Sequence, residues 1–142
     1  MFKKVIGIII VFQLICTIAS AQTNRQIEIF DISKGKVIRN VQSKPEIQEE
    51  VKEFLEGITG VYVKYNPIPN EGFMIRIPID RPVMVKNKWF NDLVDEVTII
   101  FSGQENPYLM VFDDENRMHI FTFEGDTAKL LKLLNFRPDS LG

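Results

Sequence analysis

The order of the predicted elements indicates an α+β protein with a mainly antiparallel sheet. Two strands and a helix come first, a run of strands separated by turn residues follows, and a short helix closes the chain. Strands joined by short turns pair antiparallel, whereas a parallel sheet needs a long crossover between its strands. We expect one amphipathic helix to pack on this sheet.

The first part of the chain has the three regions of a cleavable signal peptide. Two lysines precede an uncharged stretch of fourteen residues (Val5–Ile18), and the small residues Ala19–Ala21 follow it. As a helix this stretch would span about 21 Å, less than the roughly 30 Å hydrocarbon core of a bilayer. It resembles a bacterial Sec-type leader. We therefore expect residues 1–21 to be removed and residues 22–142 to form one exported domain.

Two other interpretations of the leader stay open. A slightly extended, tilted helix could remain in the membrane, and the protein would then be a tethered accessory domain with an uncleaved leader. Cys16 follows the apolar stretch, as in bacterial lipid-anchored exports, but Ile15 stands where that pattern has Gly, Ala or Ser. Lipidation is therefore the weaker of the two.

The composition of the mature chain limits its compartment and its partners. Without the leader it has 15 Lys and Arg against 19 Asp and Glu, and it loses its only cysteine. Small domains secreted through an oxidising eukaryotic route usually have disulfides, so a bacterial source and a secreted, periplasmic or extracytoplasmic location are favoured. The longest basic run is Lys86-Asn87-Lys88, too short for phosphate neutralisation, so we expect no nucleic acid partner.

The mature chain is predicted to start with a β-hairpin. Polar and apolar residues alternate through Gln26–Ile32, which is typical of a strand with one wet face. Turn residues in Ser33–Lys36 separate it from a second strand, Val37–Val41.

A helix is predicted after this hairpin. Ser43 and Glu46 have the spacing of a capping box, and Pro45 suits the first helical turn. We expect Gly57 and Gly60 to end the helix. Its apolar residues fall on one stripe: Ile47, Val51, Phe54, Leu55 and Ile58.

Further strands are predicted wherever β-branched and aromatic residues alternate between turn signals. They are Val61–Tyr65, Phe73–Ile79, Val83–Lys86, Val97–Ser102, Tyr108–Asp113 and Met118–Glu124. We expect a short helical turn at Trp89–Val94, and a final helix capped by Asp126 and running to Phe136. Its inward residues are predicted to be Leu130, Leu131, Leu133 and Leu134. The arrangement resembles cystatin-like scaffolds, a likeness of fold that implies no function.

The mature sequence has few residues suited to catalysis or metal binding. His119 is its only histidine and lies in a predicted strand between apolar residues, and no serine has a G-x-S-x-G context. Zinc needs several His or Cys ligands. The acidic run Asp113–Asn116 is predicted to be a hairpin turn, because it lacks the spacing of a calcium loop. We expect no catalytic residue, metal or cofactor.

One catalytic alternative stays open. Glycoside chemistry needs two carboxyl groups at a suitable separation, and four acids could meet in space. They are Asp92, Asp95, Glu96 and Glu124. An exported, carboxylate-dependent hydrolase would depend on such a convergence.

The loop Asn66–Gly72 is the candidate surface for a partner. Its seven residues exceed an ordinary hairpin connection, and two prolines make it stiff. Stiff apolar loops lose little entropy on docking. We expect Tyr65, Ile68 and Phe73 to be the anchors for a protein or cell-wall partner, although an edge strand protected by proline would explain the same residues. The leading hypothesis is a non-enzymatic binding or accessory module of the bacterial cell envelope.

Overall fold

The computed structural model describes residues 25–63, 68–103 and 105–138. It shows an α+β fold, a mostly antiparallel sheet with two helices. The predicted leader, its cleavage site before Gln22, and Tyr65 all lie outside the described residues.

The sheet of the described chain has seven strands, and every neighbouring pair is antiparallel. In chain order they are β1 (Ile27–Asp31), β2 (Lys36–Val41), β3 (Ile58–Val61), β4 (Phe73–Lys86), β5 (Asn91–Phe101), β6 (Tyr108–Phe112) and β7 (Met118–Phe123). Their order across the sheet is β2-β1-β4-β5-β6-β7-β3. Helix α2 (Pro45–Glu56) connects one edge strand, β2, to the opposite edge strand, β3.

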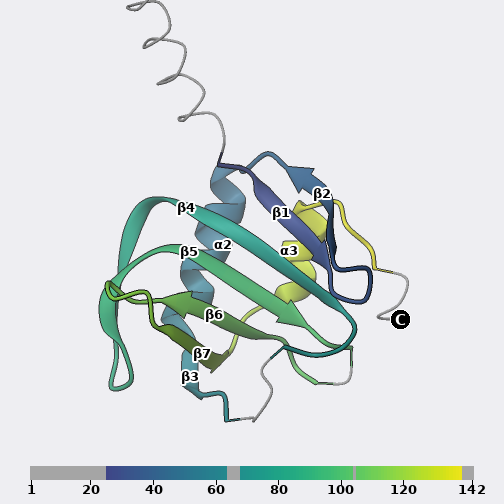
Figure 1. The fold of residues 1–142 in the computed structure, drawn as a ribbon. Helices are drawn as coiled ribbons and strands as arrows, with labels where there is room; N and C mark the ends of the chain where they lie inside the picture. Colours follow the sequence, from purple (N-terminus) through teal and green to yellow (C-terminus); the bar gives the residue numbers. More distant parts are fainter. Residues whose placement is uncertain (1–24, 64–67, 104, 139–142) are drawn as a thin grey trace, which may run out of the picture.

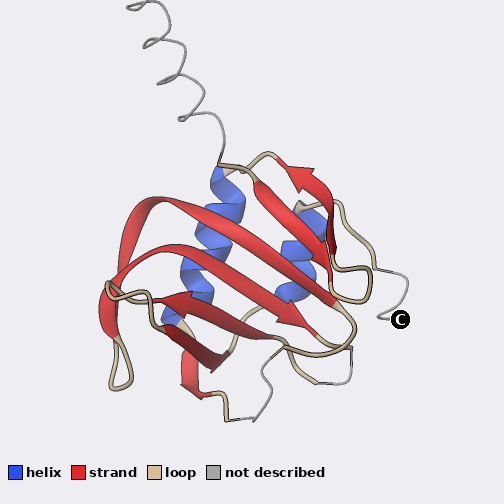
Figure 2. Ribbon diagram, viewed as in Figure 1, coloured by secondary structure: helices blue, strands red, loops and turns tan. Residues whose placement is uncertain are grey.

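Both helices lie on the same face of the sheet (Figure 1, Figure 2). Helix α2 crosses behind the strands, and α3 (Thr127–Leu133) lies beside it. The core fills the space between the helices and the strands. Its fully buried side chains include Ile29, Val51, Phe54, Ile75, Ile99, Leu109, Phe121 and Leu130.

The start of α2 differs from the predicted capping box. Lys44 is the N-cap and makes no side-chain cap, although Pro45 does open the helix as expected. The Ser43 hydroxyl instead accepts a hydrogen bond from Gln48 Nε2 at 2.7 Å, and the same amide nitrogen donates to the Pro78 carbonyl at 2.9 Å. Ser43 is therefore used to hold Gln48 against β4 rather than to cap the helix.

Helix α2 ends at Glu56, and β3 follows almost at once. The N–H of Gly57 donates to the carbonyl of Glu53 at 2.9 Å, which closes the last turn. A Cβ at this glycine would collide with the Glu124 carbonyl, so the close approach of the helix end to the end of β7 requires Gly57. Gly60, the other predicted terminator, lies within β3, and this strand starts before the predicted Val61–Tyr65.

The long hairpin of β4 and β5 corrects two predictions. The segments Phe73–Ile79 and Val83–Lys86 form one strand, because the proline-containing stretch between them is a bulge rather than a turn. Trp89–Val94 does not form a helical turn. Asn87 Oδ1 accepts from the N–H groups of Trp89 and Phe90 at 2.8 and 2.9 Å, which turns the chain tightly enough for β5 to begin at Asn91.

Helix α3 is shorter than predicted but is capped as expected. Asp126 accepts from the N–H of Lys129 at 3.0 Å. Leu130 and the C-cap residue Leu134 are buried, whereas Leu131 and Leu133 are only half-buried, contrary to the predicted four inward leucines. Lys129 reaches the buried carboxylate of Glu50 on α2 at 3.2 Å, and this hydrogen bond raises the pKa of the lysine. The pair ties the two helices together.

Candidate functional site

The side of the sheet opposite the helices, here called the uncovered face, has an apolar cluster of its own. Ile100, Tyr108 and Ile120 are buried there, and Tyr62, Met74 and Met110 pack against them. The rings of Tyr62 and Tyr108 stack with centroids 3.9 Å apart, and the Tyr62 hydroxyl donates to Glu105 Oε2 at 2.6 Å. Burial raises the pKa of both tyrosines above its usual value, so both hydroxyl groups remain donors.

Two cross-strand pairs extend this apolar surface into solvent. Phe112 on β6 lies opposite Met118 on β7, and Met84 on β4 lies opposite Leu93 on β5. All four side chains are about half exposed. Large apolar side chains that neighbour one another in pairs form a patch, unlike the single exposed residues that are common on soluble proteins.

Methionine is concentrated on the uncovered face. The four methionines of the described chain are Met74, Met84, Met110 and Met118, and strand alternation places each of them on this side. The unbranched thioether side chain adapts to irregular apolar shapes, and it is over-used on surfaces that bind other proteins.

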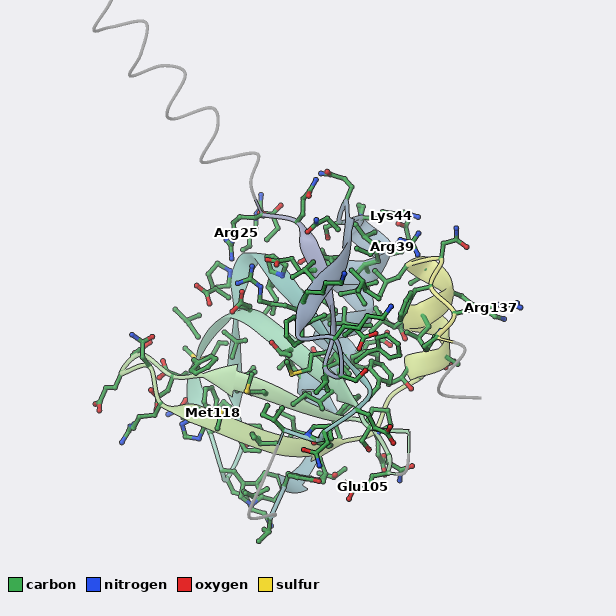
Figure 3. The ribbon with its side chains drawn as sticks, turned by 45° about the vertical axis from the view of Figure 1, so that its right-hand side comes forward. Arg25, Arg39, Lys44, Glu105, Met118 and Arg137 are labelled. Carbon is green, nitrogen blue, oxygen red and sulfur yellow. The ribbon has the colours of Figure 1, made fainter. Side chains whose placement is uncertain are left out.

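Three charged side chains of the uncovered face pair with one another near β1. Arg76 on β4 pairs with Glu28 on β1, and also with Glu96 on β5 at 3.2 Å. Strands β6 and β7 carry no Asp, Glu, Lys or Arg, so their part of the face is uncharged (Figure 3 labels Met118 at one end of it).

The structure describes two of the three predicted anchors, and they differ in exposure. Ile68 is 38% exposed, and Tyr65 lies outside the described residues. Phe73 is buried in the core and contacts Phe136 edge-on, with ring centroids 5.2 Å apart. As the first residue of β4 it alternates in step with Ile75 and so faces the helices, which removes it from any exposed surface.

His119 is held by an acidic turn. Its Nε2 lies 2.9 Å from Asp113 Oδ2, and its ring meets the edge of Phe90 at 5.0 Å between centroids. Asp113 also accepts from Arg117 Nε at 2.8 Å and from the N–H of Glu115 at 2.9 Å. These hydrogen bonds, that of His119 first, hold the pKa of Asp113 well below its usual range. The arrangement anchors the hairpin between β6 and β7.

Two of the four candidate carboxylates, Glu96 and Asp92, contact groups outside the candidate set. Glu96 pairs with Arg76, and Asp92 instead lies beside Asp114, whose N–H donates to Asp92 Oδ2 at 3.1 Å. A hydrogen bond between the two carboxyl groups raises the pKa of Asp114, and the backbone donor lowers that of Asp92. Glycosidases hold their carboxyl groups about 5 Å or more apart. Within the described chain no group of three metal-ligating side chains is found.

A polar hollow of about 430 Å³ lies where α2 begins, next to β4. Its walls include Arg25, Lys44, Gln48 and Asp80. Gln48 is already fully engaged, since its amide also accepts from the N–H of Asp80 at 2.9 Å. The hollow therefore reflects how the helix is fastened to the strand.

Comparisons with protein-family models, with curated proteins and with solved structures find no match. In the part of the chain that is described, neither helix is long and apolar enough to cross a membrane. Function must therefore be inferred from the residues and their geometry.

Proposed function

We propose that this protein is a small, non-enzymatic binding module that acts in the bacterial cell envelope, outside the cytoplasm, and holds a protein partner on its uncovered face. The observation that supports this most directly is the one-sided cover of the sheet. Both helices pack on one face, and the other face carries a small buried apolar cluster together with two apolar pairs that are half exposed to water. The proposal includes the predicted amphipathic character of α2. A single apolar stripe lets the helix pack on one face of the sheet only.

Burial of this surface would supply binding free energy. Each Å² of apolar surface removed from water contributes roughly 25 cal/mol, before the costs of association are subtracted. Met118 and Leu93 are half exposed in the folded chain, so folding does not use the free energy of burying them completely. A partner that covers these side chains gains this hydrophobic free energy on binding.

The chemistry of the face favours a protein over a cell-wall glycan. A glycan presents hydroxyl groups, and burying them against an apolar surface leaves hydrogen bonds unmade. The large side chains that this face exposes are apolar: Met84, Leu93, Phe112 and Met118. A protein partner with its own apolar patch matches this composition.

Site-specific photocrosslinking in the native host tests the proposal. A photoreactive residue at Met118, Phe112 or Met84 should give one adduct of the same mass from each position. The matched control is Lys52, which is exposed on the outer side of α2. The proposal is wrong if the uncovered face gives no discrete adduct, or if position 52 gives the same one.

Two alternatives remain as proposals of their own. A carboxylate-dependent hydrolase would use a pair among Asp92, Asp95, Glu96 and Glu124. Replacement of one member of that pair by its amide should then abolish a measured turnover without unfolding the protein. A membrane-tethered accessory domain would keep its leader. The intact mass of the protein recovered from its host decides whether the chain begins at Gln22.

A further inference from the structure

The two edges of the sheet, β2 and β3, are protected to different degrees. An edge strand presents unpaired N–H and C=O groups, which can pair with another chain. Soluble proteins limit this pairing with charged residues, bulges and short edges. The two edges of this sheet can therefore be compared on the same terms.

The β2 edge has strong protection. Residues 32–45 contain four basic residues and no acidic one, and a bulge interrupts the pairing of β2 with β1. Arg39 and Lys44, two of these basic residues, are labelled in Figure 3. The exposed Val37 and Ile38 thus lie among positive charges.

The β3 edge differs in charge, although β3 has only four residues and its pairing with β7 also has a bulge. No charged residue occurs from Gly57 to Val63, and Val61 and Val63 are 50% and 88% exposed. The pairing with β7 continues past the end of β3, since the N–H of Tyr62 donates to the Ile120 carbonyl at 2.9 Å. In an antiparallel edge the backbone groups alternate in direction, so those of Val61 and Val63 point away from the sheet.

We propose that the β3 edge pairs with the β3 edge of a second copy of this chain, around a two-fold axis at Tyr62. In this register Val61 of one copy lies opposite Val63 of the other, and the outward backbone groups exchange four hydrogen bonds. The valine side chains meet on the helix side of the sheet. The two Tyr62 side chains meet on the uncovered face, next to the rings of Tyr108.

Charge and symmetry favour a second copy of this chain as the partner of the β3 edge. Pairing β2 with β2 would bring Lys36 and Arg39 of two chains together, which is repulsive. Pairing β2 with β3 is head-to-tail and leaves a free edge at each step, so it would grow into a fibre. Pairing β3 with β3 closes, and it leaves only the protected β2 edges at the two ends of the combined sheet.

This dimer does not depend on the binding proposed for the uncovered face, and each can fail without the other. The paired segment is short, so the interface belongs to the small class and a dissociation constant on the order of micromolar is expected.

Sedimentation velocity over a concentration series tests the dimer, using the exported protein as recovered. The wild type should change from monomer to dimer as its concentration rises through the micromolar range. Val63→Glu should weaken the dimer at least tenfold, and Val63 is exposed enough that the melting temperature should not change. The matched control is Val37→Glu on the β2 edge, which should leave the dimer intact.

A double variant tests the register. Val61→Lys combined with Val63→Glu places opposite charges across the two-fold axis, so dimerisation should recover relative to Val63→Glu alone. A wild type that stays monomeric at every concentration would overturn the proposal. Equal weakening by Val37→Glu, or no recovery in the double variant, would also overturn it.

Discussion

On the helix side of the sheet, Ile75 and Ile99 are fully buried beneath the helices, whereas on the uncovered face Phe112 and Met118 remain half exposed on strands of the same sheet. Strand alternation gives each of these strands two rows of side chains, and both rows are rich in apolar residues. The helices cover one row only. The comparison teaches that packing explains the first row but not the second, for which we propose contact with another molecule.

The largest expected effect lies on the helix side. Phe54 is completely buried, with its ring 5.0 Å from that of Phe123. Phe54→Ala leaves a cavity between α2 and the sheet, so we expect it to lower the free energy of unfolding by about 3–5 kcal/mol. Denaturant unfolding measures this loss.

The matched variant on the other side is Phe112→Ala. Phe112 is partly exposed to water, so Phe112→Ala should lower the free energy of unfolding by much less than Phe54→Ala does. Equal losses at the two positions would mean that the uncovered face is packed as tightly as the core, and the contrast between the faces would be lost.

A smaller, pH-dependent effect is expected at Asp113, where β6 turns into β7. Its pKa is lower in the folded protein than the usual value near 4. The carboxylate therefore stabilises the fold above about pH 4, and this contribution is lost as the pH falls below it. Asp113→Asn should lower the melting temperature at pH 7 and make the remaining acid sensitivity smaller.

Melting curves of the wild type and of Asp113→Asn, recorded from neutral to acidic pH, check this expectation. The control is Glu49→Gln, an exposed change on α2 that should leave the pH dependence as in the wild type. If the melting temperatures of wild type and Asp113→Asn stay the same distance apart down to the lowest pH, the turn is not held by the ionised carboxylate.

The α+β class and most of the strands could be predicted from alternation and turn residues. The joining of two segments into β4 could not, because Pro78 and Pro82 are normally taken as the ends of strands, and only the pairing with β5 shows that they flank a bulge. The helical turn predicted at Trp89–Val94 failed for a similar reason. The side chain of Asn87 sets a tight hairpin there, and sequence spacing does not show this hydrogen bond.

The candidate site was the least predictable part. Alternation indicates that a strand has two apolar faces, but which one the helices cover depends on how the whole chain folds. Phe73 was expected to anchor a partner, although its spacing from Ile75 and Ile77 already placed it in the same row of the strand as these two residues. The methionines at alternate strand positions were the available signal for the uncovered face, and they resembled ordinary core residues in the sequence.

The smallest expected effect on stability, and the most informative for function, is at Met118. Its side chain is half exposed and lies opposite Phe112, so Met118→Lys keeps most of its aliphatic stem in place and moves a charge into water. We expect the free energy of unfolding to change by no more than about 0.5 kcal/mol, as at other exposed positions. A protein partner would instead have to bury that charge, so the crosslinked adduct from Phe112 should be lost. The control is Lys52→Glu, which changes charge on the outer side of α2 and should leave both measurements as in the wild type. If Met118→Lys lowers the melting temperature as strongly as a core substitution does, its side chain supports the fold. The uncovered face would then be explained by packing after all.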